Sequence, residues 1–153
     1  MTAGAPPESQ TYDVHRDEDS LWCAGRGRRL AEQLGFDEQG GGAIAIAISE
    51  LVSNAIKFAG RGTLTLRPLH APRPGLEVTV QDDGPGIEDF AKALQDGFSE
   101  GRMISDDAPK AARPRRGLGA GLGAVMRLMD ELETEVPFGG GLIIKARKYL
   151  PGD

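Results

Sequence analysis

The stretch ISELVSNAIKFAG, residues 48–60, places polar side chains along one line of an otherwise apolar helix. Glu50, Asn54 and Lys57 stand at offsets of four and seven, which at about 100° per residue brings them near one face. A carboxylate can accept a proton from a hydroxyl, an amide oxygen suits Mg²⁺, and an ammonium group can bind phosphate oxygens. The stripe therefore fits a phosphate-handling site, and it also fits the solvated face of an ordinary amphipathic helix.

The helix that carries this stripe is the clearest element of the chain. It is expected to begin between Asp37 and Ala43 and to end at Ala59, with glycine following at once. Helices come first along the chain, and strands interleaved with helices follow. That order favours an α/β (α+β) two-layer sandwich with a mixed sheet and helices packed on one face. The other expected elements are strands over residues 11–15, 63–69, 76–81 and 142–149, and helices from residue 19 or 20 to 34, over 88–95 and over 120–132.

A second polar segment, DDGPGI, comes directly after a predicted strand and spans residues 82–87. Gly84 and Gly86 allow a tight turn and a close approach of a ligand to the backbone, next to Ile87. Asp82, at the end of the strand, is placed to accept a hydrogen bond from an amino group. The same letters also describe a common turn, so the segment alone leaves both interpretations open.

A third segment is rich in glycine and opens the last predicted helix. The amino end of a helix exposes unpaired amides and the positive end of the helix dipole, so it binds phosphates. Arg115 and Arg116 add positive charge just before it. The segment is no Walker loop, because no Gly-Lys-Ser/Thr follows, and it lacks the preceding strand of a dinucleotide site. Its residues are Gly117, Leu118, Gly119, Ala120, Gly121, Leu122 and Gly123.

Composition narrows the class of protein. The 153 residues suit one domain, expected over residues 10–150 after a disordered tail at 1–9. A net charge of −5 argues against a nucleic-acid partner. No membrane span or secretion signal is expected, and the single cysteine excludes an internal disulfide. These features favour a cytoplasmic protein.

Taken together and in this order, the three segments resemble the boxes of the GHKL (Bergerat-fold) ATPase and kinase superfamily. The resemblance covers residues 10–150. It implies ATP and Mg²⁺ as cofactors, Glu50 as general base, Asn54 as Mg²⁺ ligand and Asp82 as the contact to the adenine amino group. Residues 97–116 would form the ATP lid. The remaining implied nucleotide contacts are Lys57, Gly84, Gly86, Ile87, Arg116 and residues 117–123.

Within this superfamily the chain resembles the anti-sigma-factor serine/threonine kinases, and most closely the RsbT-type switch kinases of the stressosome. The matching stretches are RRLAEQLGF, ISELVSNAIKFAGRG, DGFSEG and GLGAGLGAVMRLMDELE. The resemblance implies phosphorylation of Ser or Thr on STAS-domain proteins, followed by activation of an RsbU-type phosphatase. The chain departs from the pattern in a longer lid and in Gly123-Ala124, where Pro-Gly is expected.

Other functions remain open at this point. An RsbW-type anti-sigma factor uses the same fold to sequester a sigma factor and carries the same Glu and Asn. A detached histidine kinase catalytic domain, or an ATP-binding scaffold without transfer activity, would also fit the boxes. Whether the chain forms a homodimer is likewise left open.

Overall fold

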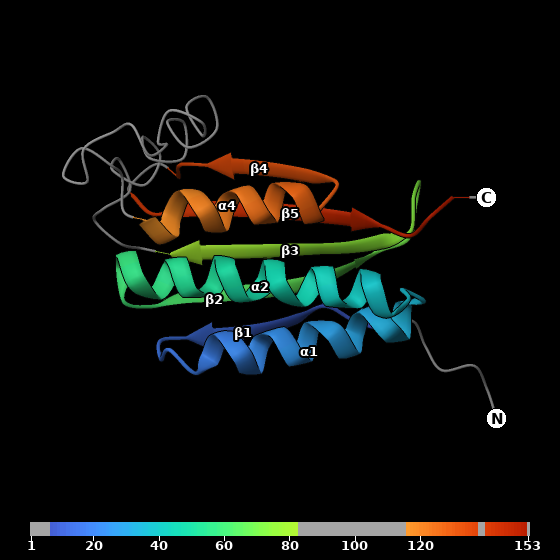
Figure 1. Ribbon diagram of the computed structural model, residues 1–153, viewed down its shortest axis with the longest axis horizontal. Coiled ribbons are helices and arrows are strands. Elements are labelled where there is room, and N and C mark those ends of the chain that lie inside the picture. The colour runs from blue at the N-terminus through green and yellow to red at the C-terminus, as the bar shows by residue number, and fades with distance from the viewer. Residues whose placement is uncertain (1–6, 83–115, 138–139, 153) are drawn as a thin grey trace.

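The computed structural model describes residues 7–82, 116–137 and 140–152, with the backbone alone for residues 116–120. A five-stranded sheet forms one layer in the order β1-β2-β3-β5-β4, and the helices form the other (Figure 1). The expected two-layer α/β sandwich is thereby confirmed. The elements are β1 Gln10–Val14, α1 Asp19–Leu34, α2 Glu38–Ala59, β2 Gly62–Leu69, β3 Gly75–Asp82, α4 Arg116–Leu128, β4 Glu131–Glu135 and β5 Leu142–Tyr149.

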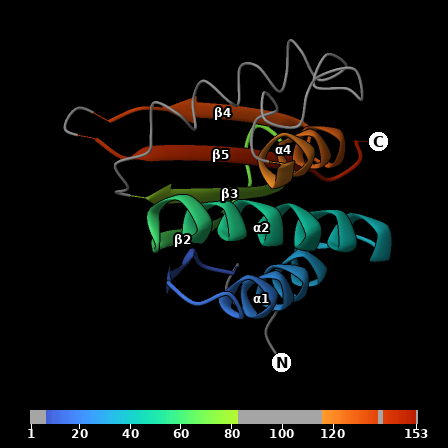
Figure 2. The same ribbon diagram turned by 60° about the vertical axis from the view of Figure 1, so that its left-hand side comes forward.

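The sequence predicted a mixed sheet, with both parallel and antiparallel strands. All four ladders between the described strands are antiparallel, including the β2–β3 hairpin that the alternating sequence predicted. Figure 2 shows α1, α2 and α4 along the same face of this sheet, with α2 between the other two. This arrangement places α2, which carries the polar stripe, at the centre of the helical layer.

Local chemistry sets both ends of α2. Asp37 caps the helix by accepting a hydrogen bond from the amide of Gly40 at 2.7 Å. Gly60 ends it in the left-handed conformation at φ 83°, which glycine adopts without strain. The glycines at 40–42 lie inside the helix despite their low helix propensity. Gly40 is buried against Phe36, where a methyl group would stand 3.0 Å from the ring, so the missing side chain allows close packing at that position.

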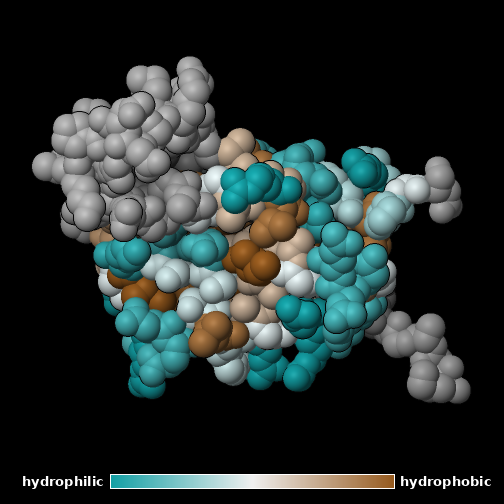
Figure 3. All heavy atoms as spheres, in the orientation of Figure 1, coloured by the Kyte–Doolittle hydropathy of each residue, from teal (hydrophilic) through white to brown (hydrophobic). Residues whose placement is uncertain are grey.

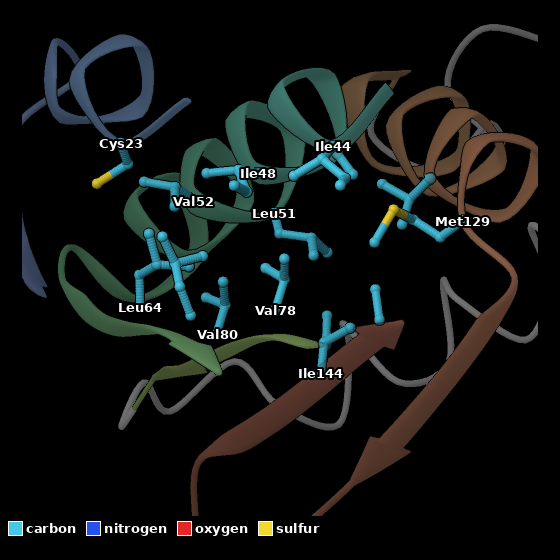
Figure 4. Close-up of a cluster of buried hydrophobic side chains, with 14 of the residues drawn as sticks. Cys23, Ile44, Ile48, Leu51, Val52, Leu64, Val78, Val80, Met129 and Ile144 are labelled. Atoms are coloured by element: carbon cyan, nitrogen blue, oxygen red, sulfur yellow. The ribbon is translucent and has the colours of Figure 1, made fainter. Parts of the chain in front are cut away.

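The hydrophobic core lies between α2 and the sheet (Figure 4). Leu51 of α2 points toward Val78 of β3, whereas Ile48 of α2 lies against Gly27 of α1. Ile48, Leu51 and Val78 are all nearly inaccessible. This packing accounts for the apolar composition of α2. The helix is long and apolar enough to cross a membrane by length and composition, contrary to the expectation that no segment of the chain would be. That property is also common in the core helix of a packed domain.

The carboxyl-terminal third differs from prediction in two places. The last helix was expected over residues 120–132, but α4 begins at Arg116 and ends at Leu128. Leu132 lies instead in β4, a strand that the sequence analysis did not predict. Leu132 pairs with Ala146 of β5 and packs against the core, so its apolar side chain fits a helical period and a strand equally well. The expected short helix at 88–95 and residues 97–115 of the lid lie outside the described residues.

Figure 3 shows hydrophilic residues around the edge of the helical layer and apolar residues near its centre. The large exposed apolar side chains of this layer include Ile46 of α2 and Met126 of α4, with exposed fractions of 49% and 46%, and Leu21 and Trp22 of α1, at 73% and 49%. Exposed apolar side chains are ordinary at protein surfaces.

Two glycines in α1 provide a test of how this layer is packed. Gly25 is exposed and a methyl group there would meet nothing within 4 Å, whereas at Gly27 it would collide with Ile48 of α2. Gly25→Ala should stabilise the protein by up to about 1 kcal/mol, because alanine favours the helix, and should raise Tm by roughly 2–4 °C. Gly27→Ala should gain less or lose stability. Thermal unfolding of both variants checks this, and an equal gain at Gly27 would contradict the packing of α1 on α2.

Candidate functional site

The polar stripe of α2 meets the glycine-rich part of α4. A methyl group placed on Gly121 would stand 2.6 Å from Oε2 of Glu50 and 3.8 Å from Nδ2 of Asn54. Glu50 and Asn54 occupy adjacent turns of α2, so both side chains are directed toward α4. The structure therefore brings together members of two segments that lie far apart in the sequence.

Asn54 is buried in an unusual way. Its side chain is only 2% exposed, and its Nδ2 has no hydrogen-bond partner among the described residues. An amide donor left unsatisfied in the interior typically costs about 1–3 kcal/mol. Such a cost is expected where a ligand, rather than the protein, supplies the partner.

Asp82 is the last residue of β3 and lies at the same end of the molecule. It is 8% exposed and pairs with Gly62 of β2 and Leu142 of β5. Gly62 in turn lies beneath α2, since a methyl group there would stand 3.3 Å from Cβ of Ala55, the residue after Asn54. Figure 1 shows the end of β3, the carboxyl-terminal half of α2 and the start of α4 at this one end. Asp82, the described residue of the second segment, thus lies at the same end of the molecule as the contact between the first and third segments.

The start of α4 differs from the expected start at Ala120. Because the helix begins at Arg116, the glycine-rich residues form its first two turns. The amides without an intrahelical partner are those of the first turn, residues 116–119. Residues 121–123 follow this turn, so their amides are within reach of intrahelical partners. The amides left free by the helix therefore lie earlier than a start at Ala120 would have placed them.

Some predicted contact residues face elsewhere. The side chain of Leu122 is 1% exposed and belongs to the hydrophobic core, so it is not available to a ligand. A methyl group on Gly123 would stand 3.4 Å from Nη1 of Arg127 on the same helix, not near Glu50. Lys57 is exposed in the last turn of α2, where a cation complements the helix dipole. Gly84, Gly86, Ile87 and Arg115 lie outside the described residues.

The donor set fits a magnesium nucleotide. In the described part of the chain no three His, Cys, Asp or Glu side chains gather into a metal site of their own. Asn54 offers an amide oxygen, which is a hard ligand of the kind Mg²⁺ takes together with substrate phosphates. Its unpartnered Nδ2 is a donor suited to a phosphate oxygen. One amide ligand from the protein is therefore enough for a Mg²⁺ ion whose other ligands include phosphate oxygens.

Comparison with known proteins places this geometry in a family. The model of the histidine kinase-like ATPase domain matches residues 26–148, which include α2, β3 and α4. The chain belongs to this family. The match covers all three segments of the site, so the recognition of a GHKL-type fold is confirmed.

Characterised relatives narrow the class of protein. The chain is 38% identical to the serine/threonine-protein kinase RsbT of Bacillus subtilis over 125 residues, which cover 81% of this chain and 84% of RsbT. It is 31% identical to the anti-sigma F factor of Thermoanaerobacter pseudethanolicus over 112 residues, 72% of this chain and 71% of that protein. The anti-sigma F factor of Caldanaerobacter subterraneus is 31% identical over 109 residues, 70% of this chain and 68% of that protein. These relatives support the predicted enzyme class, a protein kinase with an ATPase domain.

A second polar cluster lies on the opposite face of the sheet and has a structural role. Glu77 is 4% exposed and accepts hydrogen bonds from Arg67 at 3.0 Å and from Arg147 at 2.8 Å. Burial alone would raise the pKa of Glu77, but the bonds from the two arginines outweigh it and hold the pKa below its ordinary value. Arg147 also pairs with Glu131 and Glu133. Each charge at its centre is satisfied within the protein, whereas the Nδ2 of Asn54 has no partner in the described part of the chain.

The contact between Glu50 and Gly121 was not foreseen. Sequence reasoning placed Gly121 among the phosphate contacts, because glycines at the start of a helix suggest a ligand. The structure shows that its absent side chain faces the carboxylate of Glu50. Only the pairing of α2 with α4 reveals this, and no local pattern in either helix encodes that pairing.

Proposed function

We propose that this protein transfers the γ-phosphoryl group of Mg²⁺-ATP to a Ser or Thr hydroxyl of a STAS-domain partner. The observation that carries the proposal is the group formed by Glu50, the unpartnered amide of Asn54 and the bare backbone at Gly121. This group places a proton acceptor, Glu50, close to a side chain that can bind phosphate, Asn54. The printed name of the relative from Bacillus subtilis, a serine/threonine-protein kinase, agrees with this chemistry.

Each residue has a distinct task in the proposed transfer. Asp82 accepts a hydrogen bond from the adenine amino group and sets the position of the nucleotide. Asn54 holds the phosphate end through its amide, together with the metal that neutralises phosphate charge. Glu50 orients the partner's hydroxyl and takes its proton as the oxygen bonds to the γ-phosphorus, while the bond to the β-phosphate breaks and ADP leaves. Positioning and charge neutralisation supply most of the rate in such reactions.

The biological outcome that we propose is partner switching. Phosphorylation adds about −1.5 to −2 charges to a surface and weakens or creates an interface accordingly. Release from the phosphorylated STAS protein would free the kinase to activate an RsbU-type phosphatase in the cytoplasm. The similarity to RsbT over 81% of this chain supports this proposal.

A second function is favoured by the other relatives. Two proteins that are 31% identical to this chain are named anti-sigma F factors. A chain of this kind would bind and sequester a sigma factor, using the same fold and the same nucleotide site. The two functions differ in the partner that is retained, so a binding experiment separates them.

The proposal is tested by incubating the protein with Mg²⁺-ATP and candidate STAS-domain proteins encoded near its gene. We expect acid-stable phosphate on a Ser or Thr of one of them, identified by mass spectrometry. Acid-labile phosphate on histidine, or nucleotide binding with no transfer to any STAS protein, would contradict it. A parallel pull-down with sigma factors from the same organism tests the second function.

A further inference from the structure

The space where a side chain would stand on Gly121 is occupied by Glu50. A methyl group there would lie 2.6 Å from Oε2 and 3.3 Å from Cδ of the Glu50 carboxylate. Optimal contacts between nonbonded heavy atoms are about 3.5–4.0 Å, so any larger residue at position 121 displaces the carboxylate. Gly121 is itself buried, which shows that the carboxylate approaches the backbone of α4 without solvent between them.

Helix α4 is not free to move away from such a collision. Leu122 and Val125 are 1% and 0% exposed and pack into the core on the sheet side of α4. The carboxylate of Glu50, by contrast, is the end of a flexible side chain. A larger residue at 121 would therefore leave the helices in place and move the carboxylate.

We propose that Gly121 is a positioning residue for the general base, keeping open the space that the carboxylate of Glu50 requires. This inference rests on the proposed kinase function and assigns Gly121 a task other than contacting phosphate. A glycine that served only the nucleotide would govern affinity. A glycine that serves Glu50 governs the rate of transfer and leaves affinity alone.

The test is Gly121→Ala, with Gly42→Ala as the matched control. Gly42 lies inside α2, and a methyl group there makes only an ordinary contact of 3.7 Å with Arg28. Because a displacement of about 1 Å at a reacting centre can cost about 100-fold, we expect Gly121→Ala to lower kcat by about that factor. KM and Kd for ATP should change less than about threefold, since no phosphate contact is lost. Gly42→Ala should leave kcat unchanged.

A size-compensating change separates positioning from a general defect. Glu50→Asp shortens the side chain by one methylene and withdraws the carboxylate from position 121. The loss caused by Gly121→Ala should therefore shrink from about 100-fold to less than about fivefold in the Glu50→Asp background, as a coupled pair requires. Equal losses in both backgrounds, or a fall in nucleotide affinity that matches the fall in kcat, would overturn the proposal.

A measurement that needs no kinase activity distinguishes failure of this inference from failure of the proposed function. The ¹³C carboxyl resonance of Glu50 can be followed by NMR in the nucleotide-free protein. We expect Gly121→Ala to shift that resonance and Gly42→Ala to leave it in place. An unshifted resonance in Gly121→Ala would refute the contact, whether or not the wild-type protein proves to be a kinase.

Discussion

Glu50→Gln should lower the rate of phosphotransfer by about two to four orders of magnitude, the usual contribution of a general base. Glutamine keeps the size of the side chain and one acceptor oxygen, but its NH2 group is a donor and the side chain cannot take the proton of the attacking hydroxyl. Because the carboxylate contributes no ligand that Asn54 does not already supply, the affinity for Mg²⁺-ATP should stay within about threefold of wild type. Single-turnover transfer to the STAS partner and calorimetric titration of nucleotide measure the two quantities.

The control for Glu50→Gln is Glu32→Gln, which makes the same chemical change at an exposed position of α1. It should leave both the rate and the affinity unchanged. A Glu50→Gln variant that transfers phosphate at the wild-type rate would remove Glu50 from its proposed role. Loss of nucleotide binding in the same variant would instead make it a ligand residue.

Asn54→Leu should raise the stability of the protein and at the same time weaken its binding of Mg²⁺-ATP. The variant replaces a 2% exposed amide with an apolar side chain of similar length, and the Nδ2 of that amide has no partner among the residues that the structure describes. Relief of the unsatisfied donor should stabilise the protein by about 1 kcal/mol, or roughly 2–4 °C in Tm. Loss of the metal and phosphate contact, a hydrogen bond to a charged group worth about 1.5–3 kcal/mol, should weaken Mg²⁺-ATP binding by roughly 10- to 150-fold.

For Asn54→Leu, thermal unfolding measures the expected gain in stability, and calorimetric titration measures the expected loss of nucleotide affinity. Ser53→Ala, at the exposed neighbouring position of α2, serves as the control and should change neither quantity appreciably. Destabilisation of Asn54→Leu together with unaltered nucleotide affinity would indicate that Asn54 has a purely structural role.

Most of the fold could be predicted because its signals are local. The alternation in residues 63–69 and 76–81 predicted the β2–β3 hairpin, and the bounds agree within one residue at each end. Gly35 ends α1 in the left-handed conformation at φ 104°, as its place after Leu34 indicated. Such features depend on residues a few positions apart, which the sequence displays directly.

The errors arose where a local pattern fits two structures. Leu132 continues the apolar period of α4, yet it lies in β4, where it pairs with Ala146 and packs, partly buried, against the core. The last helix was expected to begin at Ala120, but it begins at Arg116, so Gly117 and Gly119 lie in its first turn, and Leu122 and Val125 pack this helix against the core. In both cases tertiary packing, which local sequence does not contain, decides the outcome.

The candidate site was predictable as residue types but not as an arrangement. Helical spacing aligned Glu50 with Asn54, and the end of a strand singled out Asp82. Two features depend on how α4 lies against α2. The Nδ2 of Asn54 has no hydrogen-bond partner among the described residues, and the carboxylate of Glu50 stands where a side chain on Gly121 would be. These two observations carry the functional argument, and both required the three-dimensional structure.

The most direct test of the central claim, that three distant segments surround one nucleotide, is a crystal structure with Mg²⁺ and a nonhydrolysable ATP analogue. We predict one nucleotide per chain, with the adenine amino group at Asp82, the metal at Asn54 and the γ-phosphate beside Glu50. A nucleotide bound elsewhere, or one that leaves the Asn54 amide without a partner, would contradict the account.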